Sequence, residues 1–235
     1  MARFLKAIIF FVLINYTPQL VLAAMDDDPL LYNIMVGEME TDDSSSDLFS
    51  WDVQTWLGKN INKLWLKTEG ERESGETEYV EIQALYSRAI SSFWNFQAGI
   101  RHDTLPKLEQ NWGVIGLQGL APYWFEIDTA LFIGESGNTA LRFNVEYELL
   151  FTQKLILTPE LEINLYGQDI PEVSLGAGLS DATLGLRLRY EIRREFAPYI
   201  GIEWSKIYAG SADFVRRSGA AVSDTKVVAG LRLWF

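Results

Sequence analysis

Three groups of side chains in this 235-residue sequence could bind a metal ion or attract ions electrostatically. The first is a pair of thioethers, Met35 and Met39. The second is the neighbouring pair His102 and Asp103, in which His102 is the only histidine of the chain. Thioether and imidazole donors suit soft transition-metal ions, whereas carboxylates suit harder ones. Because the sequence contains no cysteine, thiolate metal sites, disulfides and cysteine nucleophiles are all excluded.

Met35 and Met39 lie four residues apart in a run of alternating apolar and polar residues. A regular strand would place both on one face, together with Asn33 and Gly37. At about 3.3 Å per residue the two sulfur atoms would be about 13 Å apart, which is too far to bind one ion together. They could instead act as successive sites along a lumen. The alternative is that they are ordinary filler of a lumen or contact surface.

His102 and Asp103 lie where a strand is expected to run into a loop. If the alternating apolar residues of 94–100 face lipid, Asp103 faces a lumen and His102 faces its rim. A bulge could re-aim either side chain. The alternative is that His102 is an exposed histidine with a structural or incidental role.

The third group consists of charged residues of opposite sign on neighbouring segments. The acidic set is Glu126, Asp128, Glu146, Glu148, Glu160 and Glu162, and the basic set is Arg187, Arg189, Arg193, Lys226 and Arg232. If these polar faces line a lumen, the acidic set could concentrate cations along a pore. Alternatively, the two sets could form salt bridges that close the lumen. The sequence leaves both possibilities open.

The elements that carry these side chains are predicted to be strands, because apolar and polar residues alternate from Leu30 onward. Many of the alternating runs reach the 9–11 residues or so that a tilted strand needs to cross a membrane. The usual strand of a soluble protein has about five or six residues. The predicted strands are 30–41, 47–57, 61–70, 77–87, 92–102, 111–119, 122–134, 139–151, 154–168, 181–193, 197–208 and 224–235.

Short and long connections alternate between these strands. Short turns are predicted at 58–60, 88–91, 120–121, 152–154 and 194–197, and longer polar loops at 71–76, 103–110, 169–180 and 208–223. Short turns at one rim, long loops at the other and an even strand number are typical of outer-membrane barrels. We therefore predict an all-β fold for residues 30–235: a single transmembrane antiparallel β-barrel of about 12 strands.

A soluble barrel with its apolar faces inward, as in lipocalins, is the alternative fold. Strand length, strand number and the gathering of aromatic residues toward strand ends favour the membrane barrel. A soluble barrel of a dozen strands would also enclose a lumen too wide for apolar side chains to fill. The final run, 225–235, is predicted to be the last strand and to close the barrel by pairing with the first.

Residues 1–23 are predicted to be a signal peptide, because Arg3 and Lys6 precede a short apolar run at 7–14. That run is too short to cross about 30 Å of hydrocarbon as a helix. Residues 24–29 form a short segment between the signal peptide and the barrel. This organisation predicts export to the outer membrane of a Gram-negative bacterium, with membrane lipid around the barrel.

Charge and motifs exclude two other function classes. The formal net charge of −12 argues against a nucleic-acid partner, which would need clustered Lys and Arg. His102 has no nearby serine signature of a hydrolase, and Gly176 and Gly178 lie in a loop rather than in a phosphate-binding turn. We therefore predict that the protein is not an enzyme.

Three stretches resemble the copper resistance protein B family of bacterial outer-membrane proteins. They are QGLAPYWFE at 118–126, the stretch from Thr139 to Tyr166, and the stretch from Gly178 to Trp204. A looser resemblance extends upstream through 64–70. The resemblance implies a role in copper homeostasis or resistance, in which the barrel binds copper ions or mediates their passage across the outer membrane.

The resemblance also carries expectations about ligands and partners. The tripeptide at 101–103 resembles that of family members, which is why His102 and Asp103 are named with Met35 and Met39 as candidate copper ligands. It further implies a periplasmic multicopper oxidase as a partner. Family members often carry a long Met- and His-rich segment before the barrel, and here only 24–29 stands in its place. The alternative function is that of a general porin-like or structural barrel with no metal role.

Overall fold

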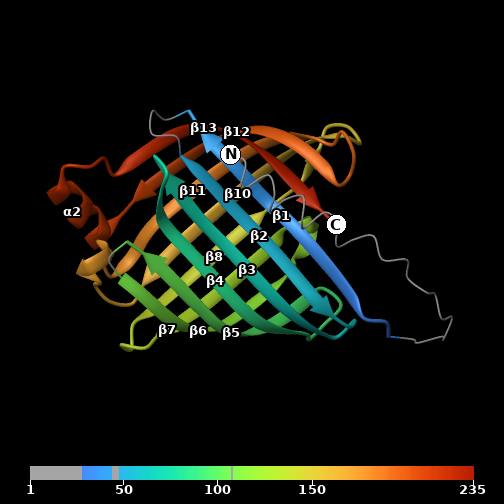
Figure 1. The fold of residues 1–235 in the computed structure, drawn as a ribbon, viewed down its shortest axis with the longest axis horizontal. Helices are drawn as coiled ribbons and strands as arrows, with labels where there is room; N and C mark the ends of the chain where they lie inside the picture. Colours follow the sequence, from blue (N-terminus) through green and yellow to red (C-terminus); the bar gives the residue numbers. More distant parts are fainter. Residues whose placement is uncertain (1–27, 44–47, 107) are drawn as a thin grey trace.

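A computed structural model of the chain describes residues 28–43, 48–106 and 108–235. The predicted signal peptide, 1–23, and most of the segment at 24–29 lie outside these residues, so both remain predictions. The described chain is almost entirely β-structure (Figure 1). Its strands are β1 (Leu31–Asp42), β2 (Phe49–Gly58), β3 (Asn62–Glu73), β4 (Glu76–Ala89), β5 (Trp94–Leu105), β6 (Leu108–Leu120), β7 (Glu126–Gly134), β8 (Thr139–Glu146), β9 (Leu149–Leu150), β10 (Leu155–Tyr166), β11 (Gly178–Tyr190), β12 (Phe196–Ile207) and β13 (Ser223–Trp234).

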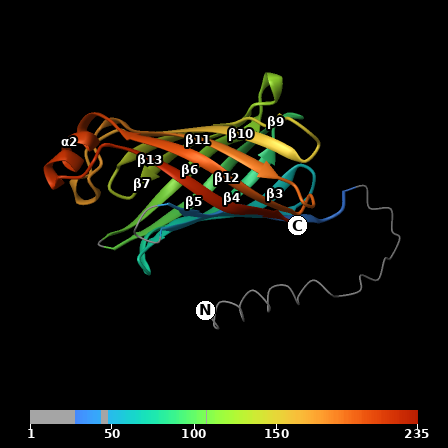
Figure 2. The same ribbon diagram turned by 90° about the horizontal axis from the view of Figure 1, so that it is seen from above.

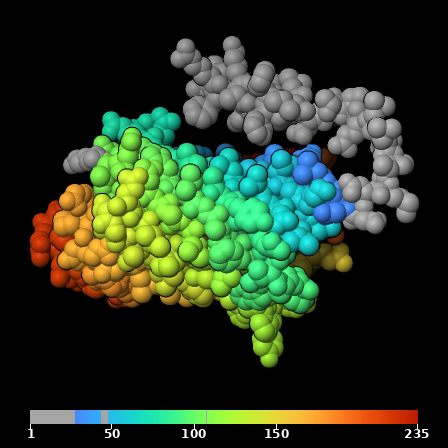
Figure 3. Space-filling model, turned by 90° about the horizontal axis from the view of Figure 1, so that it is seen from below, coloured from blue at the N-terminus to red at the C-terminus, as the bar shows by residue number. Residues whose placement is uncertain are grey.

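These strands form one closed antiparallel barrel. Each strand pairs with the next along the chain, except that β8 and β9 both pair with β10, and β13 pairs with β1 to complete the circle. At the closure, the Ile34 and Phe235 backbones exchange two hydrogen bonds of 2.9 and 2.8 Å. The prediction that the last segment pairs with the first is therefore confirmed. The space-filling view in Figure 3 shows the blue to yellow part of the chain as one continuous outer surface.

The barrel has twelve strands around its circumference, because β8 and β9 follow one another along β10. The gap between them lies beside Pro159 of β10. The Tyr147 N–H donates to the Pro159 carbonyl over 3.1 Å, but proline has no N–H to return the bond. The prediction of a single antiparallel barrel of about 12 strands is confirmed.

Apolar side chains lie on the outside of the barrel and polar ones lie inside. Ile100, Ile200 and Leu64 are each more than 60% exposed on the outer face, whereas Glu81 and Gln97 on the inner face are at most 2% exposed. A soluble lipocalin-like barrel would have the opposite arrangement. An apolar outer band around a polar lumen is the arrangement of a transmembrane barrel.

The two rims differ in their connections. The terminal rim, where β1 begins and β13 ends, carries short turns such as 59–61 and 90–93. The far rim carries two long connections, at 167–177 and 208–222. Two other long loops predicted there, 71–76 and 103–110, are wrong because β3 to β6 extend into them. Ser74 and Gly75 make the turn between β3 and β4, both with positive φ, as a tight hairpin turn requires.

The two long connections fold over the far end of the barrel (Figure 2). The connection at 208–222 contains a helix, α2 (Ala209–Ser218), which contacts β11 and was not predicted from the sequence. The connection at 167–177 contains a short 3-10 turn, η2 (Pro171–Val173). No helix within the described ranges is long and apolar enough to cross a membrane.

The loop at 167–177 closes part of the lumen from this end, and we call it the inner loop. Its apolar residues Ile170, Val173 and Leu175 pack against an apolar patch of the inner wall. That patch consists of Leu85, Trp112, Val114, Phe132 and Ala140. The lumen therefore has an apolar, loop-covered side and a charged side.

Candidate functional site: a charged lumen

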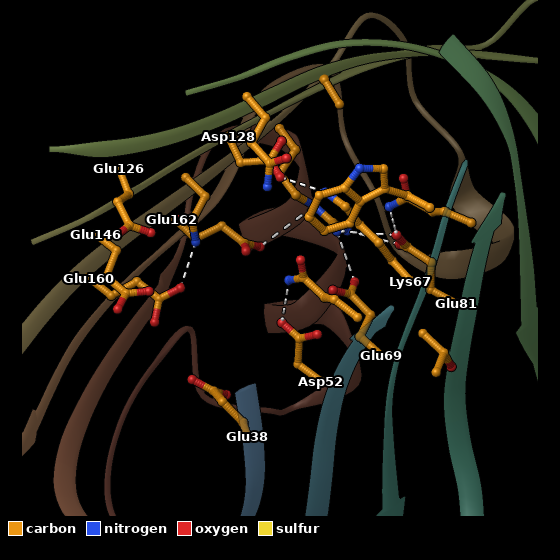
Figure 4. A pocket seen from close by; sticks show the side chains of 18 of the residues that line it. Glu38, Asp52, Lys67, Glu69, Glu81, Glu126, Asp128, Glu146, Glu160 and Glu162 are labelled. Carbon is orange, nitrogen blue, oxygen red and sulfur yellow. Dashed lines mark hydrogen bonds and ion pairs between the residues drawn. The ribbon is translucent and has the colours of Figure 1, made fainter. Parts of the chain in front are cut away.

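The lumen contains a cavity of about 1110 Å³ lined by residues from both rims. Fourteen of its lining residues are Asp or Glu and seven are Lys or Arg. Figure 4 shows carboxylates that enter this space from opposite walls, with Glu38, Asp52 and Glu69 facing Glu126, Glu146 and Glu160. The strand register explains how so many acidic side chains come to face one another.

Five acidic residues occupy directly opposed positions on five successive strands. This first acidic row consists of Glu38 on β1, Asp52 on β2, Glu69 on β3, Glu81 on β4 and Asp103 on β5. Directly opposed residues lie on the same face of a sheet, about 5 Å apart, and like charges in such pairs are destabilising. A row of this kind therefore needs positively charged groups nearby to offset the repulsion.

A second acidic row runs along the other half of the barrel. It consists of Glu126 on β7, Glu146 on β8, Glu160 on β10 and Glu203 on β12. Gly185 of β11 lies between the last two, opposite both of them. The first row was not predicted, whereas Glu126, Glu146 and Glu160 of the second belong to the acidic set predicted from the sequence. Which acidic residues lie directly opposite one another depends on the register between strands and not on the spacing within one.

Two arginines offset the negative charge at the centre of the first acidic row. Arg101 bonds to Glu81 over 2.7 Å and to Asp103 over 2.6 Å. Arg142 reaches across the lumen from β8 and bonds to Glu69 over 2.9 Å and to Glu81 over 3.0 Å. Arg101 also lies 4.5 Å over the ring of Phe132, which joins this network to the apolar patch.

Arg187 of β11 joins the two rows. Its guanidinium lies 3.0 Å from Glu38 of the first row, and 2.9 and 3.4 Å from Glu160 and Glu203 of the second. It also bonds to Glu40 over 2.5 Å. One base therefore contacts four carboxylates.

The acidic and basic sets predicted from the sequence contact each other. Arg232 bonds to Glu146 over 3.2 Å, and Arg189 bonds to Glu148 over 2.6 Å. Arg193 does not belong to the lumen, because it lies exposed in the turn after β11. Salt bridges therefore cross the lumen, as one of the two alternatives expected.

A surplus of negative charge remains after these pairs are formed. The Asp52 side chain has one hydrogen bond in the described structure, from Gln54 over 3.3 Å. Glu126, which lies near the terminal rim, has neither an ion pair nor a hydrogen bond with its side chain among the described residues. The lumen is therefore both cross-linked by ion pairs and acidic overall.

His102 and Asp103 lie on opposite faces of β5. The Asp103 carboxylate points into the lumen, where Arg101 and the Trp112 indole N–H (3.0 Å) bind it. His102 pairs with Ile82 and Asn111 on the outer side, and its Nδ1 lies 2.7 Å from the Asn111 Oδ1. Asp103 faces the lumen as predicted, whereas His102 lies within β5 and faces outward rather than toward the rim. The two side chains therefore do not share one site.

Met35 and Met39 also lie on opposite faces, so the prediction that they share one is wrong. A β-bulge between Val36 and Glu38 inserts one residue into β1 and reverses the alternation. Met35 lines the lumen, with its sulfur 4.0 Å from Arg232. Met39 faces outward, opposite Trp51. The same bulge turns Glu38 and Glu40 into the lumen.

No group of three or more His, Asp or Glu residues in the described ranges is arranged to hold a metal ion.

A closed antiparallel barrel with an apolar outer face and a charged lumen has the architecture of the outer-membrane β-barrels. The fold is similar to that of the NanC porin, with a TM-score of 0.56 at 11% identity over 86% of this chain and 99% of that one. It is also similar to the KdgM porin, with a TM-score of 0.53 at 14% identity over 86% and 99% of the two chains. Residues 30–235 match the family described as "Copper resistance protein B precursor (CopB)". The chain belongs to this copper resistance protein B family.

Two curated relatives agree with this assignment. "Copper resistance protein B" of Escherichia coli is 43% identical over 213 residues, which are 90% of this chain and 72% of that protein. "Copper resistance protein B homolog" of Pseudomonas syringae pv. tomato is 44% identical over 194 residues, which are 83% of this chain and 66% of that protein.

Proposed function

We propose that this barrel lies in the outer membrane and contributes to copper resistance by letting copper ions enter and cross its lumen. Membership of the copper resistance protein B family supports the choice of copper, and the porin fold supports passage. The two acidic rows carry the proposal, because opposed carboxylates on nine strand positions create a field that attracts cations.

Weak binding suits this function better than tight chelation. An ion that crosses a pore must bind well enough to enter and weakly enough to leave. The surplus carboxylates meet the first condition, and the arginines interleaved with them meet the second by competing for the same oxygens. No catalytic step is part of the proposal.

The proposal also includes copper contacts by the four candidate ligands, Met35, Met39, His102 and Asp103. It further includes a periplasmic multicopper oxidase that accepts the ion. Met35 lies in the lumen, where a thioether could contact a passing ion. His102 lies on the outside near the far rim, where it could meet an ion only before entry or after exit. Copper tolerance of His102→Ala, Asp103→Asn, and Met35→Ala with Met39→Ala tests these roles one at a time. A copper-dependent cross-link or co-purification would test the oxidase.

The decisive experiment deletes the gene and measures copper sensitivity and whole-cell copper content. We expect both to change and to be restored by the wild-type gene. Purified barrel in liposomes should then pass Cu(II), measured with an entrapped copper-sensitive dye. Unchanged sensitivity and content in the deletion strain, with no flux in liposomes, would leave a general structural barrel without a metal role.

A further inference from the structure

Arg187 and the carboxylates of Glu38, Glu40, Glu160 and Glu203 form what we call the Arg187 cluster. Its nearest N···O distances lie between 2.5 and 3.4 Å. Carboxylates outnumber the base four to one, so the cluster keeps a negative charge that one guanidinium cannot neutralise. The inference drawn from it rests on the proposed function and specifies where the lumen holds its cation.

Two glycines make room for this cluster on the inner wall. A Cβ at Gly185 would lie 2.5 Å from Nη1 of Arg187, so the arginine lies over a residue without a side chain. Gly230 lies between Tyr199 and Glu40 in the cross-strand register. A Cβ there would lie 2.5 Å from the Tyr199 hydroxyl. The Tyr199 ring therefore crosses Gly230 toward Glu40.

Tyr199 supplies an independent observation that this cluster binds something more. The residue is only 5% exposed, and its hydroxyl faces the Glu40 carboxylate without forming a well-aligned hydrogen bond within the described structure. A buried hydroxyl without a well-formed hydrogen bond is costly and uncommon, because it has lost its contacts with water. A water molecule carried by a bound cation would satisfy it.

The cluster is accessible from the cavity. About a quarter of each of the Glu38, Glu160 and Glu203 side chains is exposed, whereas the Glu40 side chain is almost fully buried. An incoming ion can therefore reach three carboxylates while Arg187 keeps its bond to Glu40. Because the described residues hold no preformed chelating group of three, the ion would keep part of its water shell.

We propose that the Arg187 cluster is the cation site of the lumen, where hydrated Cu(II) shares the carboxylates with Arg187. Oxygen donors favour Cu(II) over Cu(I) at this position. Arg187 acts as a resident counter-cation that weakens the binding of the ion and so allows it to leave. The Tyr199 hydroxyl positions the ion by hydrogen bonding to its water shell.

Binding and flux measured on the same barrel test this proposal. The protein is purified without a polyhistidine tag and titrated with Cu(II) in a non-chelating buffer, and its Cu(II) flux is measured in liposomes.

Removing the guanidinium charge in Arg187→Gln should tighten Cu(II) binding by about tenfold or more and slow the flux. Glu203→Gln and Glu38→Gln should each weaken binding by about fivefold. Tyr199→Phe should weaken it without changing any charge. Glu109→Gln, an exposed acid on the outer face of β6, is the matched control.

Each outcome is interpretable. An Arg187→Gln barrel that binds Cu(II) no more tightly would overturn the inference, because a purely structural salt bridge predicts that result. If this variant fails to shift its gel mobility on boiling, and so is unfolded, Glu203→Gln and Tyr199→Phe decide instead. Unchanged binding in both variants overturns the inference. Wild-type barrel that passes no Cu(II) refutes the proposed function itself, whereas normal flux unaffected by all four variants refutes only this site.

Discussion

Glu38 on β1 lies directly opposite Asp52 on β2, so two carboxylates occupy neighbouring positions on the lumen face. Arg187 bonds to Glu38, and Gln54 donates the one hydrogen bond that the structure assigns to the Asp52 side chain. Opposed like charges reduce the stability of a sheet. The pair therefore lowers the stability of the barrel while it makes the lumen more acidic. Stability and cation passage can be measured separately.

Neutralising Asp52 should raise stability and reduce cation passage at the same time. Asp52→Asn keeps the shape of the side chain and removes the repulsion of Glu38 and Glu69, which should increase the free energy of unfolding by about 0.2–1 kcal/mol. Urea unfolding followed by tryptophan fluorescence and Cu(II) flux in liposomes are the measurements. Glu109→Gln is expected to change neither, and a loss of stability in Asp52→Asn would contradict the repulsion.

Removing Arg142 should have the opposite effect on stability. Arg142→Gln would leave Glu81, whose side chain is 1% exposed, with one of its two arginines and Glu69 with none. Leaving buried charge uncompensated should reduce the free energy of unfolding by about 3 kcal/mol. Arg216→Gln removes an exposed pair with Asp213 on α2 and should stay within about 0.5 kcal/mol of wild type. Equal effects of the two variants would argue against the cross-lumen network.

The inner loop should limit ion flow through the barrel. Serine at positions 170, 173 and 175 would remove its apolar contacts with Phe132 and the surrounding patch, so the loop should leave the wall more often. We expect larger single-channel conductance in planar bilayers. Glu172→Gln changes an exposed residue of the same loop and serves as the control. Identical conductance in the triple variant and the wild type would show that the loop does not narrow the pathway.

Phe235 should matter chiefly through its backbone. Deleting it removes both hydrogen bonds to Ile34 and opens the seam between β13 and β1, whereas Phe235→Ala keeps them. The deletion should therefore lower the amount of folded barrel in the membrane fraction more than Phe235→Ala does. Normal levels of the deletion variant would contradict this role.

The sequence alone predicted the outer architecture of this protein well. Twelve alternating runs predicted twelve strands, and the polar faces of 139–166 and 181–193 proved, apart from Arg193, to be lumen faces. Alternation is a local property, because successive side chains of a strand point to opposite faces. It can therefore be recognised within a single strand. The resemblance around 118–126 predicted the family, which the match over 30–235 confirmed.

Other features were decided only when the strands paired. The bulge after Val36 separated Met35 from Met39 and turned Glu38 into the lumen. Its one sign in the sequence is that Glu38 and Glu40 fall where the apolar series of Ile34 and Val36 would continue. The two acidic rows and the contacts of Arg187 depend on the stagger between strands far apart in sequence. A shift of one residue in any pair would move these carboxylates to the lipid face. Composition and spacing thus determined that the protein is a barrel with charged faces, whereas register, which is a property of the closed sheet, decided which charges meet.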